Sequence, residues 1–353
     1  MQYILHVTNK CNFSCDYCDV PKNDSAMDKS TAFKVVDFAL ENALKIGHKA
    51  VCMSFYGGEP LLCKDLIYNV IDYCKDISKN TNVNFSFKLT TNGWFIDEPF
   101  LKYAKTSPID VALSIDGIEK AHDMHRLTTD NKPTFKRVYE IAKALIAQLP
   151  DSSAMLTVNP NSVEFLLESI KFLFDNGFKI IVTTPNFSTD WTEEDLDNLK
   201  NQYEGLAAWY GEVLLEGKEL HLPIFDNKII NWLTPEIMSD KCIPGKYRVS
   251  VDVEGNIYPC IQYVYNKKYE IGNFNRLSQA PIDDTKLKFI VAESEKGMAE
   301  CDNCALNSRC DNKCGCKNLA LTGSLKKVSP LVCAHEQILI PIADALGNRI
   351  FIN

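Results

Sequence analysis

The sequence predicts an α/β fold for the first 190 residues, followed by a smaller α+β region that is rich in cysteine. Two observations support this prediction. Short apolar runs with β-branched and aromatic residues alternate with amphipathic helical stretches, and the alternation occurs six times. Strands joined by helical crossovers form a parallel sheet. Six units are too few for a closed eight-stranded barrel, so an open partial barrel and a doubly wound sheet remain as architectures.

The predicted strands are short and are bounded by turn residues. They cover Tyr3–Val7, Val51–Tyr56, Val83–Thr90, Ile109–Ile115, Ala154–Val158 and Lys179–Thr184. Apolar residues recur at helical spacing between the strands, for example in Ser30–Leu44 and Phe135–Leu149. A long helix is predicted over Glu193–Leu215, after the sixth strand.

The composition changes in the last third of the chain. Polar and apolar side chains alternate in Lys246–Gly255 and the stretch ends in a turn, which predicts a β-hairpin. Eight of the 14 cysteines lie between Cys242 and Cys333. We therefore expect two domains, 1–225 and 226–353, the second with a C-terminal helix.

Composition and charge exclude several classes of protein. The formal net charge of −8 argues against nucleic-acid binding, which needs clustered Lys and Arg. No apolar run is long enough for a membrane span, and the N-terminus does not have the pattern of a secretory signal. Fourteen cysteines in 353 residues are too few for a disulfide scaffold. We expect a cytoplasmic protein whose cysteines bind metal.

Three cysteines follow the first strand directly and form what we call the cysteine loop, Cys11-Asn-Phe-Ser-Cys15-Asp-Tyr-Cys18. Functional groups in parallel α/β proteins lie at the C-terminal ends of strands. Structural zinc prefers four closed ligands, and this loop provides three. A 4Fe–4S cluster held by three cysteines leaves one iron open to a substrate or cofactor. The loop therefore predicts an iron–sulfur cluster with an open iron.

This C-x3-C-x2-C loop resembles that of the radical S-adenosylmethionine (SAM) enzymes, whose fold is a partial, TIM-like (β/α)6 barrel. The resemblance favours that architecture for the first domain. It implies that the open iron chelates the amino and carboxylate groups of SAM. Reductive cleavage of the cofactor would then give a 5′-deoxyadenosyl radical that abstracts hydrogen. The aromatic residue before the third cysteine, here Tyr17, would pack near the adenine.

Further elements of the same family follow the next three predicted strands. They are Tyr56-Gly57-Gly58-Glu59-Pro60, Thr91-Asn92-Gly93 and Ser114-Ile115-Asp116-Gly117. The resemblance implies that the first holds the methionine amino group and that the third lies near the ribose and carboxylate. Arg126 is a candidate to clamp the methionine carboxylate, and a solvated helix-start arginine is the alternative. The backbone of Val182 is a further candidate adenine contact.

Seven cysteines in the last third have the spacing of the SPASM domain, which this region resembles and which holds two auxiliary 4Fe–4S clusters. The resemblance implies three clusters in the chain. One auxiliary cluster would use Cys242, Cys260 and Cys314, and the other would use Cys301, Cys304, Cys310 and Cys333. Two zinc sites are the alternative, because four-cysteine shells suit zinc equally well.

The first auxiliary cluster has three implied ligands, so its fourth position is open to interpretation. Cys316 can complete the shell, or the iron stays open or water-ligated. The tight spacing of Cys314 and Cys316 favours the open site. The other cysteines, Cys52, Cys63 and Cys74, are expected to be small buried side chains.

Asp226 is the candidate catalytic base. The segment Ile224-Phe225-Asp226-Asn227 resembles the Phe-Asp segment of sulfatase-maturating enzymes, in which the Asp acts as base. A helix N-cap is the alternative role for this residue.

Relatives with both domains mostly modify peptides or proteins, so the resemblance implies a peptide or protein substrate. We expect a ribosomal peptide maturase that forms a thioether or carbon–carbon crosslink or an epimer. The alternatives are an anaerobic sulfatase maturase that oxidises Cys or Ser to formylglycine, a small-molecule dehydrogenase and, in another class, a zinc-stabilised binding protein. Tyr56 stands where sulfatase maturases often have Gln. A reductant such as flavodoxin or ferredoxin is implied. A separate leader-peptide-binding partner is expected if the peptide does not bind in the barrel mouth.

Overall fold

The computed structural model describes residues 1–234, 243–276, 280–295, 299–310 and 314–352. Cys242, one of the predicted cluster ligands, lies outside these residues. The chain divides into two compact units, each built from separate stretches of sequence. Unit 1 contains Met1–Phe13, Cys18–Ala112 and Cys242–Lys296, and unit 2 contains Ser14–Tyr17, Leu113–Lys241 and Gly297–Asn353.

Unit 1 is built on a sheet with the strand order β4-β3-β2-β1-β7-β8-β9. These strands are β1 (Gln2–Thr8), β2 (Ala50–Gly57), β3 (Asn84–Thr91), β4 (Ile109–Ser114), β7 (Arg248–Val251), β8 (Asn256–Tyr258) and β9 (Gly272–Asn273). Strand β1 pairs in parallel with both β2 and β7, and β2 pairs in parallel with β3. Strands β7 and β8 are antiparallel, which confirms the predicted hairpin.

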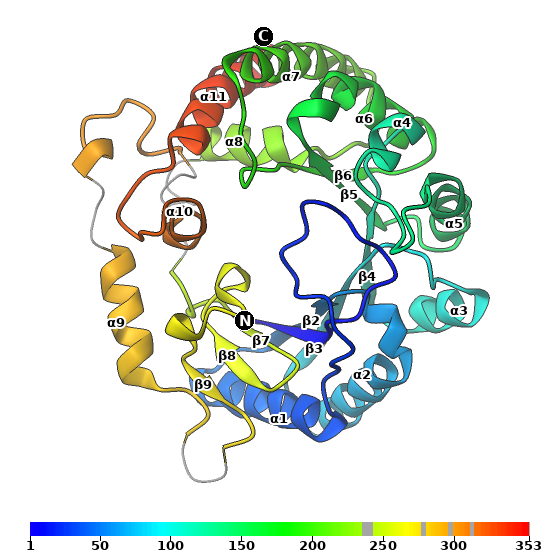
Figure 1. The fold of residues 1–353 in the computed structure, drawn as a ribbon, viewed down its shortest axis with the longest axis vertical. Coiled ribbons are helices and arrows are strands. Elements are labelled where there is room, and N and C mark those ends of the chain that lie inside the picture. The colour runs from blue at the N-terminus through cyan, green and yellow to red at the C-terminus, as the bar shows by residue number, and fades with distance from the viewer. Residues whose placement is uncertain (235–242, 277–279, 296–298, 311–313, 353) are drawn as a thin grey trace. The chain divides into compact units, whose positions relative to one another are not determined.

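Helices α1 (Lys29–Ile46) and α2 (Lys64–Ser78) pack against this sheet. The other helices of unit 1 are α3 (Glu98–Thr106) and α9 (Asp284–Glu295). Tyr3 and Leu5 alternate with His6 along β1 and are fully buried. The Tyr3 ring contacts Phe38 of α1 edge-on, with the ring centroids 6.2 Å apart, and α1 and α2 lie along this side of the strands (Figure 1).

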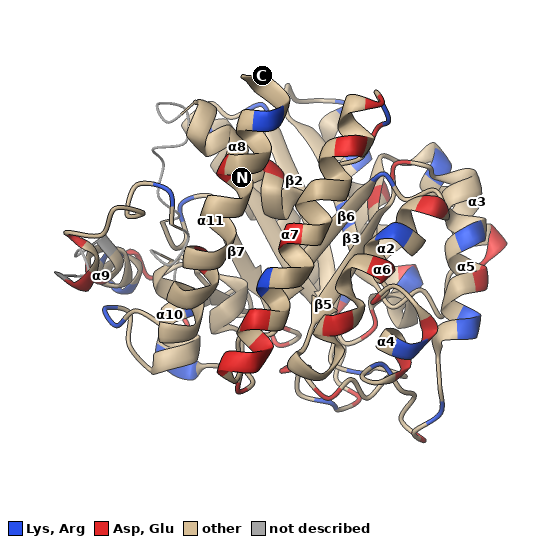
Figure 2. Cartoon of the chain, turned by 90° about the horizontal axis from the view of Figure 1, so that it is seen from above, with Lys and Arg blue, Asp and Glu red and all other residues tan. Residues whose placement is uncertain are grey.

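Unit 2 also contains a pair of parallel strands. Its own strands are β5 (Ser153–Val158) and β6 (Ile180–Pro185). Its helices are α4 (Glu119–Asp123), α5 (Phe135–Gln148), α6 (Leu166–Asp175), α7 (Glu193–Leu215), α8 (Pro223–Leu233), α10 (Gly315–Thr322) and α11 (Pro330–Phe351). Helix α11 lies beside α7 and α8 (Figure 1). Both acidic and basic residues occur along α5 and α7 (Figure 2).

The predicted secondary structure of the first half is confirmed. Each of the six predicted strands is present, with ends within one residue of the prediction, and α7 has the predicted bounds. Helix α8 begins before residue 225 and ends after it, and the division into domains 1–225 and 226–353 stays a prediction. Among the described residues, no helix combines the length and the apolar character that crossing a bilayer requires.

Candidate active site

The cysteine loop follows β1, and all three of its thiols are half-buried. In unit 1, Sγ of Cys11 accepts a hydrogen bond from the backbone N–H of Phe13 at 3.4 Å and lies 3.9 Å from Nδ2 of Asn92. Nζ of Lys22 lies 3.2 Å from Sγ of Cys18. The sulfur atoms of Cys11 and Cys18 therefore each lie near at least one hydrogen-bond donor, and such neighbours orient thiolate ligands of a metal centre.

These residues fit an iron–sulfur cluster in their chemistry. Burial raises the pKa of the Cys11 thiol, and the positive charge of a bound metal centre would act against that rise. Within the described ranges, no three His, Cys, Asp or Glu side chains lie close enough to bind a single metal ion. A cubane cluster places each thiolate on a different iron, so its ligands stand apart rather than converge.

The two glycines after β2 allow a close approach to the chain that enters the cysteine loop. A Cβ atom on Gly57 would lie 2.3 Å from the carbonyl oxygen of Thr8, and one on Gly58 would lie 2.2 Å from that of Lys10. The N–H of Gly58 donates to the Thr8 carbonyl at 2.7 Å. Gly57 also has a φ of +127°, which favours glycine. The glycine pair therefore anchors the backbone just before Cys11.

Glu59 is completely buried and joins the ends of β2 and β3. Its Oε1 accepts from the N–H of Leu61 at 2.9 Å and from Oγ1 of Thr91 at 2.7 Å, and its Oε2 accepts from the N–H of Asn92 at 2.8 Å. Burial raises the pKa of Glu59, and these three donors act against that rise. Nδ2 of Asn92 in turn donates to Oδ1 of Asn12, in the cysteine loop, at 3.0 Å. The two motifs thus form one hydrogen-bonded support for this loop.

Arg126 is buried, so the alternative of a solvated arginine is wrong. Its Nε and Nη2 donate to the two carboxylate oxygens of Asp116 at 2.6 and 2.9 Å. The N–H of Thr157 and the hydroxyl of Tyr17 also donate to Asp116, at 2.9 and 3.2 Å. Burial acts to lower the pKa of Arg126, but Asp116, Tyr17 and Cys15 together act against this effect and the net shift is upward. The two nitrogens suited to a bidentate clamp thus bind Asp116.

The residues between Asp116 and Arg126 support this pair. The N–H of Asp116 donates to Nδ1 of His122 at 3.2 Å, so Nε2 of His122 donates to Oγ1 of Thr134, 3.0 Å away. Burial lowers the pKa of His122 to about 3. The carboxylate of Asp123 accepts the N–H groups of Thr134 and Phe135, at 2.8 and 2.9 Å, at the start of α5. The segment after β4 is therefore a rigid hydrogen-bonded structure.

Asp226 does not form a helix N-cap, because the N-cap of α8 is Leu222 and Asp226 lies in the first turn. Its Oδ1 accepts the hydroxyl of Tyr210 at 2.7 Å, and its Oδ2 lies 4.0 Å from Nδ1 of His221. Burial raises the pKa of Asp226, and both neighbours act against that rise. A partly buried carboxylate with a raised pKa is suited to accept a proton.

The C-terminal cysteines are divided between the units. Cys260 is buried in unit 1, at the start of a 3-10 turn after β8. The others lie in unit 2 and are Cys301, Cys304, Cys310, Cys314, Cys316 and Cys333. Cys314 is the N-cap of α10 and is half-buried, and Cys316, inside that helix, is buried.

The two remaining predicted contacts lie on strands of the sheet. Ser114 is the last residue of β4, and Val182 lies within β6 opposite Met155. Both are half-buried. Their roles as cofactor contacts stay predictions.

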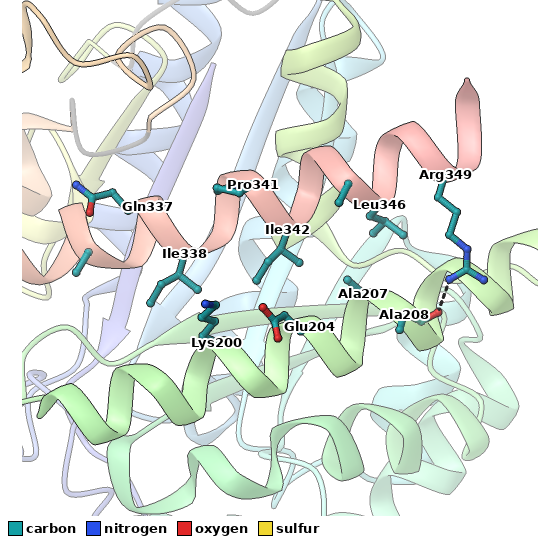
Figure 3. Close-up of a pocket in the computed structure, with 12 residues that line it drawn as sticks. Lys200, Glu204, Ala207, Ala208, Gln337, Ile338, Pro341, Ile342, Leu346 and Arg349 are labelled. Carbon is teal, nitrogen blue, oxygen red and sulfur yellow. Dashed lines mark hydrogen bonds between the residues drawn. The ribbon is translucent and has the colours of Figure 1, made fainter. Parts of the chain in front are cut away.

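A separate groove of about 740 Å³ lies between α7 and α11 in unit 2 (Figure 3). Its lining includes Ala207, Ile338, Pro341 and Leu346, with Arg349 at one end. None of the predicted site residues lines this groove.

Some residues that contact the cysteine loop have no motif that marks them in the sequence. Lys22 contacts Cys18 from four positions further along the chain. Asp16 and His125 form a contact across 109 positions. Their spacing carries no signal, because only the fold brings them together.

Comparisons with known proteins agree with this geometry. The sequence pattern of the radical SAM superfamily matches residues 5–173, which contain the cysteine loop and the elements after β2, β3 and β4. This chain belongs to the radical SAM superfamily. The pattern of the SPASM iron–sulfur cluster-binding domain matches residues 242–305. The protein is therefore a radical SAM enzyme with a SPASM domain, and the alternative of a zinc-stabilised binding protein is not retained.

Several relatives of this radical SAM enzyme have been described. An uncharacterized protein of Methanocaldococcus jannaschii is 36% identical over 185 residues, which are 50% of this chain and 60% of that protein. A cysteine-type anaerobic sulfatase-maturating enzyme of Clostridium novyi is 22% identical over 329 residues, 88% of this chain and 86% of that enzyme.

Two solved structures have the same fold. Native anSMEcpe with bound AdoMet and the Cp18Cys peptide matches with a TM-score of 0.82 and 19% identity, over 99% of each chain. SuiB of Streptococcus suis bound to the precursor peptide SuiA matches with a TM-score of 0.64 and 17% identity, over 94% of this chain and 75% of that chain. The fold class is thus confirmed as a partial barrel of the radical SAM type with a SPASM domain.

Proposed function

We propose that this enzyme modifies a peptide or protein by hydrogen abstraction, as a ribosomal peptide maturase. One observation carries the proposal. Hydrogen bonds of Glu59 and Asn92 join the Gly-Gly-Glu-Pro and Thr-Asn elements to the cysteine loop. The similarity to enzymes whose structures contain peptides supports a peptide substrate. The clusters and SAM, when bound, supply a 5′-deoxyadenosyl radical that abstracts a hydrogen atom.

The chain's own residues divide the work as follows. Cys11, Cys15 and Cys18 would hold the 4Fe–4S cluster that binds SAM. Tyr17 would lie against the adenine. The backbone of the Gly57–Pro60 element would hold the amino group. The segment around Ser114 and the backbone of Val182 would contact the ribose and adenine.

Two auxiliary clusters would bring the total to three. One would use Cys301, Cys304, Cys310 and Cys333. Cys333 lies in the first turn of α11, where the helix dipole favours a negatively charged ligand. The other would use Cys242, Cys260 and Cys314, with an open or water-ligated fourth position.

Asp226 would accept the proton that leaves the substrate after the electron is removed. Its raised pKa and partial exposure suit this role, and the Tyr210 hydroxyl orients the carboxylate.

The reaction also needs electrons and a supply of peptide. A small redox protein such as flavodoxin or ferredoxin would deliver the electrons. The peptide would bind in the barrel mouth or be delivered by a separate leader-binding protein. We also infer a cytosolic location, because thiolate-bound clusters require a reducing environment.

Anaerobic assay of the reconstituted enzyme tests the proposal. The enzyme is incubated with SAM, a reductant and the small peptides encoded beside its gene, and both 5′-deoxyadenosine and peptide mass are measured. Formation of 5′-deoxyadenosine with a peptide mass lower by two hydrogens supports a crosslink. A peptide mass that is unchanged in ordinary water, with uptake of one deuterium when the reaction is run in deuterated water, supports epimerisation. Turnover of SAM with every such peptide left unmodified would contradict the maturase assignment.

Sulfatase maturation is the second candidate, because similarity to a sulfatase-maturating enzyme extends over 88% of this chain. In the same assay, a sulfatase-derived peptide would gain an aldehyde in place of its Cys thiol or Ser hydroxyl. Conversion of that peptide together with inertness towards the neighbouring peptides would select this function instead.

A further inference from the structure

The middle of the cysteine loop is held by residues that follow β4. The N–H of Ser14 donates to the backbone carbonyl of Leu127 at 2.8 Å. Oδ2 of Asp16 lies 2.8 Å from Nδ1 of His125. The stretch Ser14–Tyr17 therefore belongs to unit 2.

Tyr17 provides a third attachment. Its hydroxyl donates to Asp116, whose position is fixed by the two-pronged contact with Arg126. The guanidinium carbon of Arg126 lies 5.4 Å from the centre of the Tyr17 ring, a cation–π contact. The His125 ring lies 5.9 Å from the same ring. Tyr17 is thus held at its hydroxyl and at its ring.

His125 is buried, but its polar contact is made to an exposed residue. The side chain of His125 is 4% exposed and that of Asp16 is 61% exposed. A carboxylate only accepts, so Nδ1 of His125 is the donor. Nε2 of His125 has no hydrogen-bond partner among the residues that the structure describes. Burying an imidazole with one unpartnered nitrogen costs folding free energy, so stability alone does not account for this residue.

We propose that His125 and Arg126 are positioning residues for the cysteine loop. They fix Asp16 and Tyr17, the two residues between Cys15 and Cys18, and so hold Cys15 where the cluster needs it. The inference rests on the proposed ligation of the cluster by Cys15. Substitution of residues that orient metal ligands without touching the metal commonly lowers metal affinity by roughly 10- to 100-fold.

Three variants test this role in the enzyme with its clusters in place. Asp16→Ala removes an exposed partner and leaves the core untouched. His125→Leu removes the donor but keeps most of the volume, and His125→Asn keeps an N–H donor near the position of Nδ1. Asp24→Asn is the matched control, because Asp24 is exposed and pairs at 2.8 Å with exposed Lys10 before the same loop.

The measurement is the rate at which a chelator abolishes the EPR signal that changes when SAM is added, with no substrate present. We expect loss roughly 10- to 100-fold faster in Asp16→Ala and His125→Leu, an intermediate rate in His125→Asn, and the wild-type rate in Asp24→Asn. Circular dichroism checks that each variant is folded.

If the chelator abolishes the signal of Asp16→Ala at the wild-type rate, the inference is overturned, even if His125→Leu does not fold. Cys15→Ala separates this outcome from a failure of the proposed function. If Cys15→Ala keeps the SAM-responsive signal, the proposed ligation is wrong. If it loses the signal and Asp16→Ala does not, only the positioning role is wrong.

Discussion

The backbone N–H of Asn92 donates to Oε2 of Glu59 at 2.8 Å, and this bond joins the ends of two neighbouring strands inside unit 1. Each of the three groups that contact the Glu59 carboxylate is a donor. Glu59 therefore organises backbone and side chains that approach the cysteine loop, rather than presenting its own carboxylate to a ligand.

Glu59→Gln is expected to destabilise the protein. An amide has one acceptor oxygen, so its NH2 group would face at least one of the present donors. We expect the free energy of unfolding to fall by about 2 kcal/mol, measured by urea unfolding. Glu140→Gln, at an exposed ion pair on α5, is the control and should change it by less than about 0.5 kcal/mol. Equal effects of the two variants would contradict the role of Glu59.

Gly58→Ala is expected to displace the chain before Cys11. The new Cβ would lie 2.2 Å from a backbone oxygen of Lys10, so the backbone must shift. We expect the free energy of unfolding to fall by about 1–3 kcal/mol and the iron content of the protein to be lower. Gly205→Ala in α7 is the control, since its Cβ would meet only the end of the Leu167 side chain, at 3.1 Å. A Gly58→Ala protein with the wild-type iron content would contradict this account.

His6 is expected to make stability depend on pH. Burial lowers the pKa of His6 from 6.5 to about 4, so below pH 6.5 the unfolded chain binds a proton that the folded chain does not. As the pH is lowered from 6.5 to about 4, this residue should therefore reduce the free energy of unfolding by about 1.4 kcal/mol per pH unit. His6→Phe should have a correspondingly flatter profile of urea midpoint against pH. Parallel profiles for the two proteins would show that His6 does not titrate in this way.

Asp226→Asn is expected to abolish product formation and to leave cleavage of SAM intact. Tyr210→Phe is the companion variant. It removes a donor that lowers the pKa of Asp226, so that pKa should rise further. Because a base acts only above its pKa, the acidic limb of the rate profile should move to higher pH. Product formation by Asp226→Asn at the wild-type rate would dismiss the catalytic assignment.

Cys316→Ala is expected to keep the iron content of the wild type, whereas Cys314→Ala should lose the iron of one auxiliary cluster. Cys316 is buried within α10, whereas Cys314 is the half-buried N-cap before that helix, with an extended backbone. Iron analysis of both variants decides the matter. Equal iron loss would assign Cys316 as the fourth ligand.

The sequence was sufficient to predict the strands of the first half, because alternating β-branched and aromatic residues bounded by turns are a local signal. It was also sufficient to place the motif residues at strand ends. It did not predict what those residues contact. Arg126 looked like a cofactor clamp or a solvated residue, and it is in fact paired with buried Asp116. Such contacts depend on which distant segments the fold brings together, and a single sequence carries no record of that.

The same limit applies to the grouping of the chain into units. Nothing in the residues of β1 indicates that its second neighbour is β7, because both strands have an ordinary apolar pattern. The expectation of consecutive domains follows from the change in composition and stays a prediction. Each compact unit is built from separate stretches of sequence.

The pairing of β1 with β7 has a consequence for how the protein is made. Strand β1 leaves the ribosome long before β7, the strand that covers its second edge, which begins at Arg248. Until that residue has been synthesised, one edge of β1 offers unpaired N–H and C=O groups to any other extended chain. A chain that ends before β7 is therefore expected to aggregate more readily than the full chain.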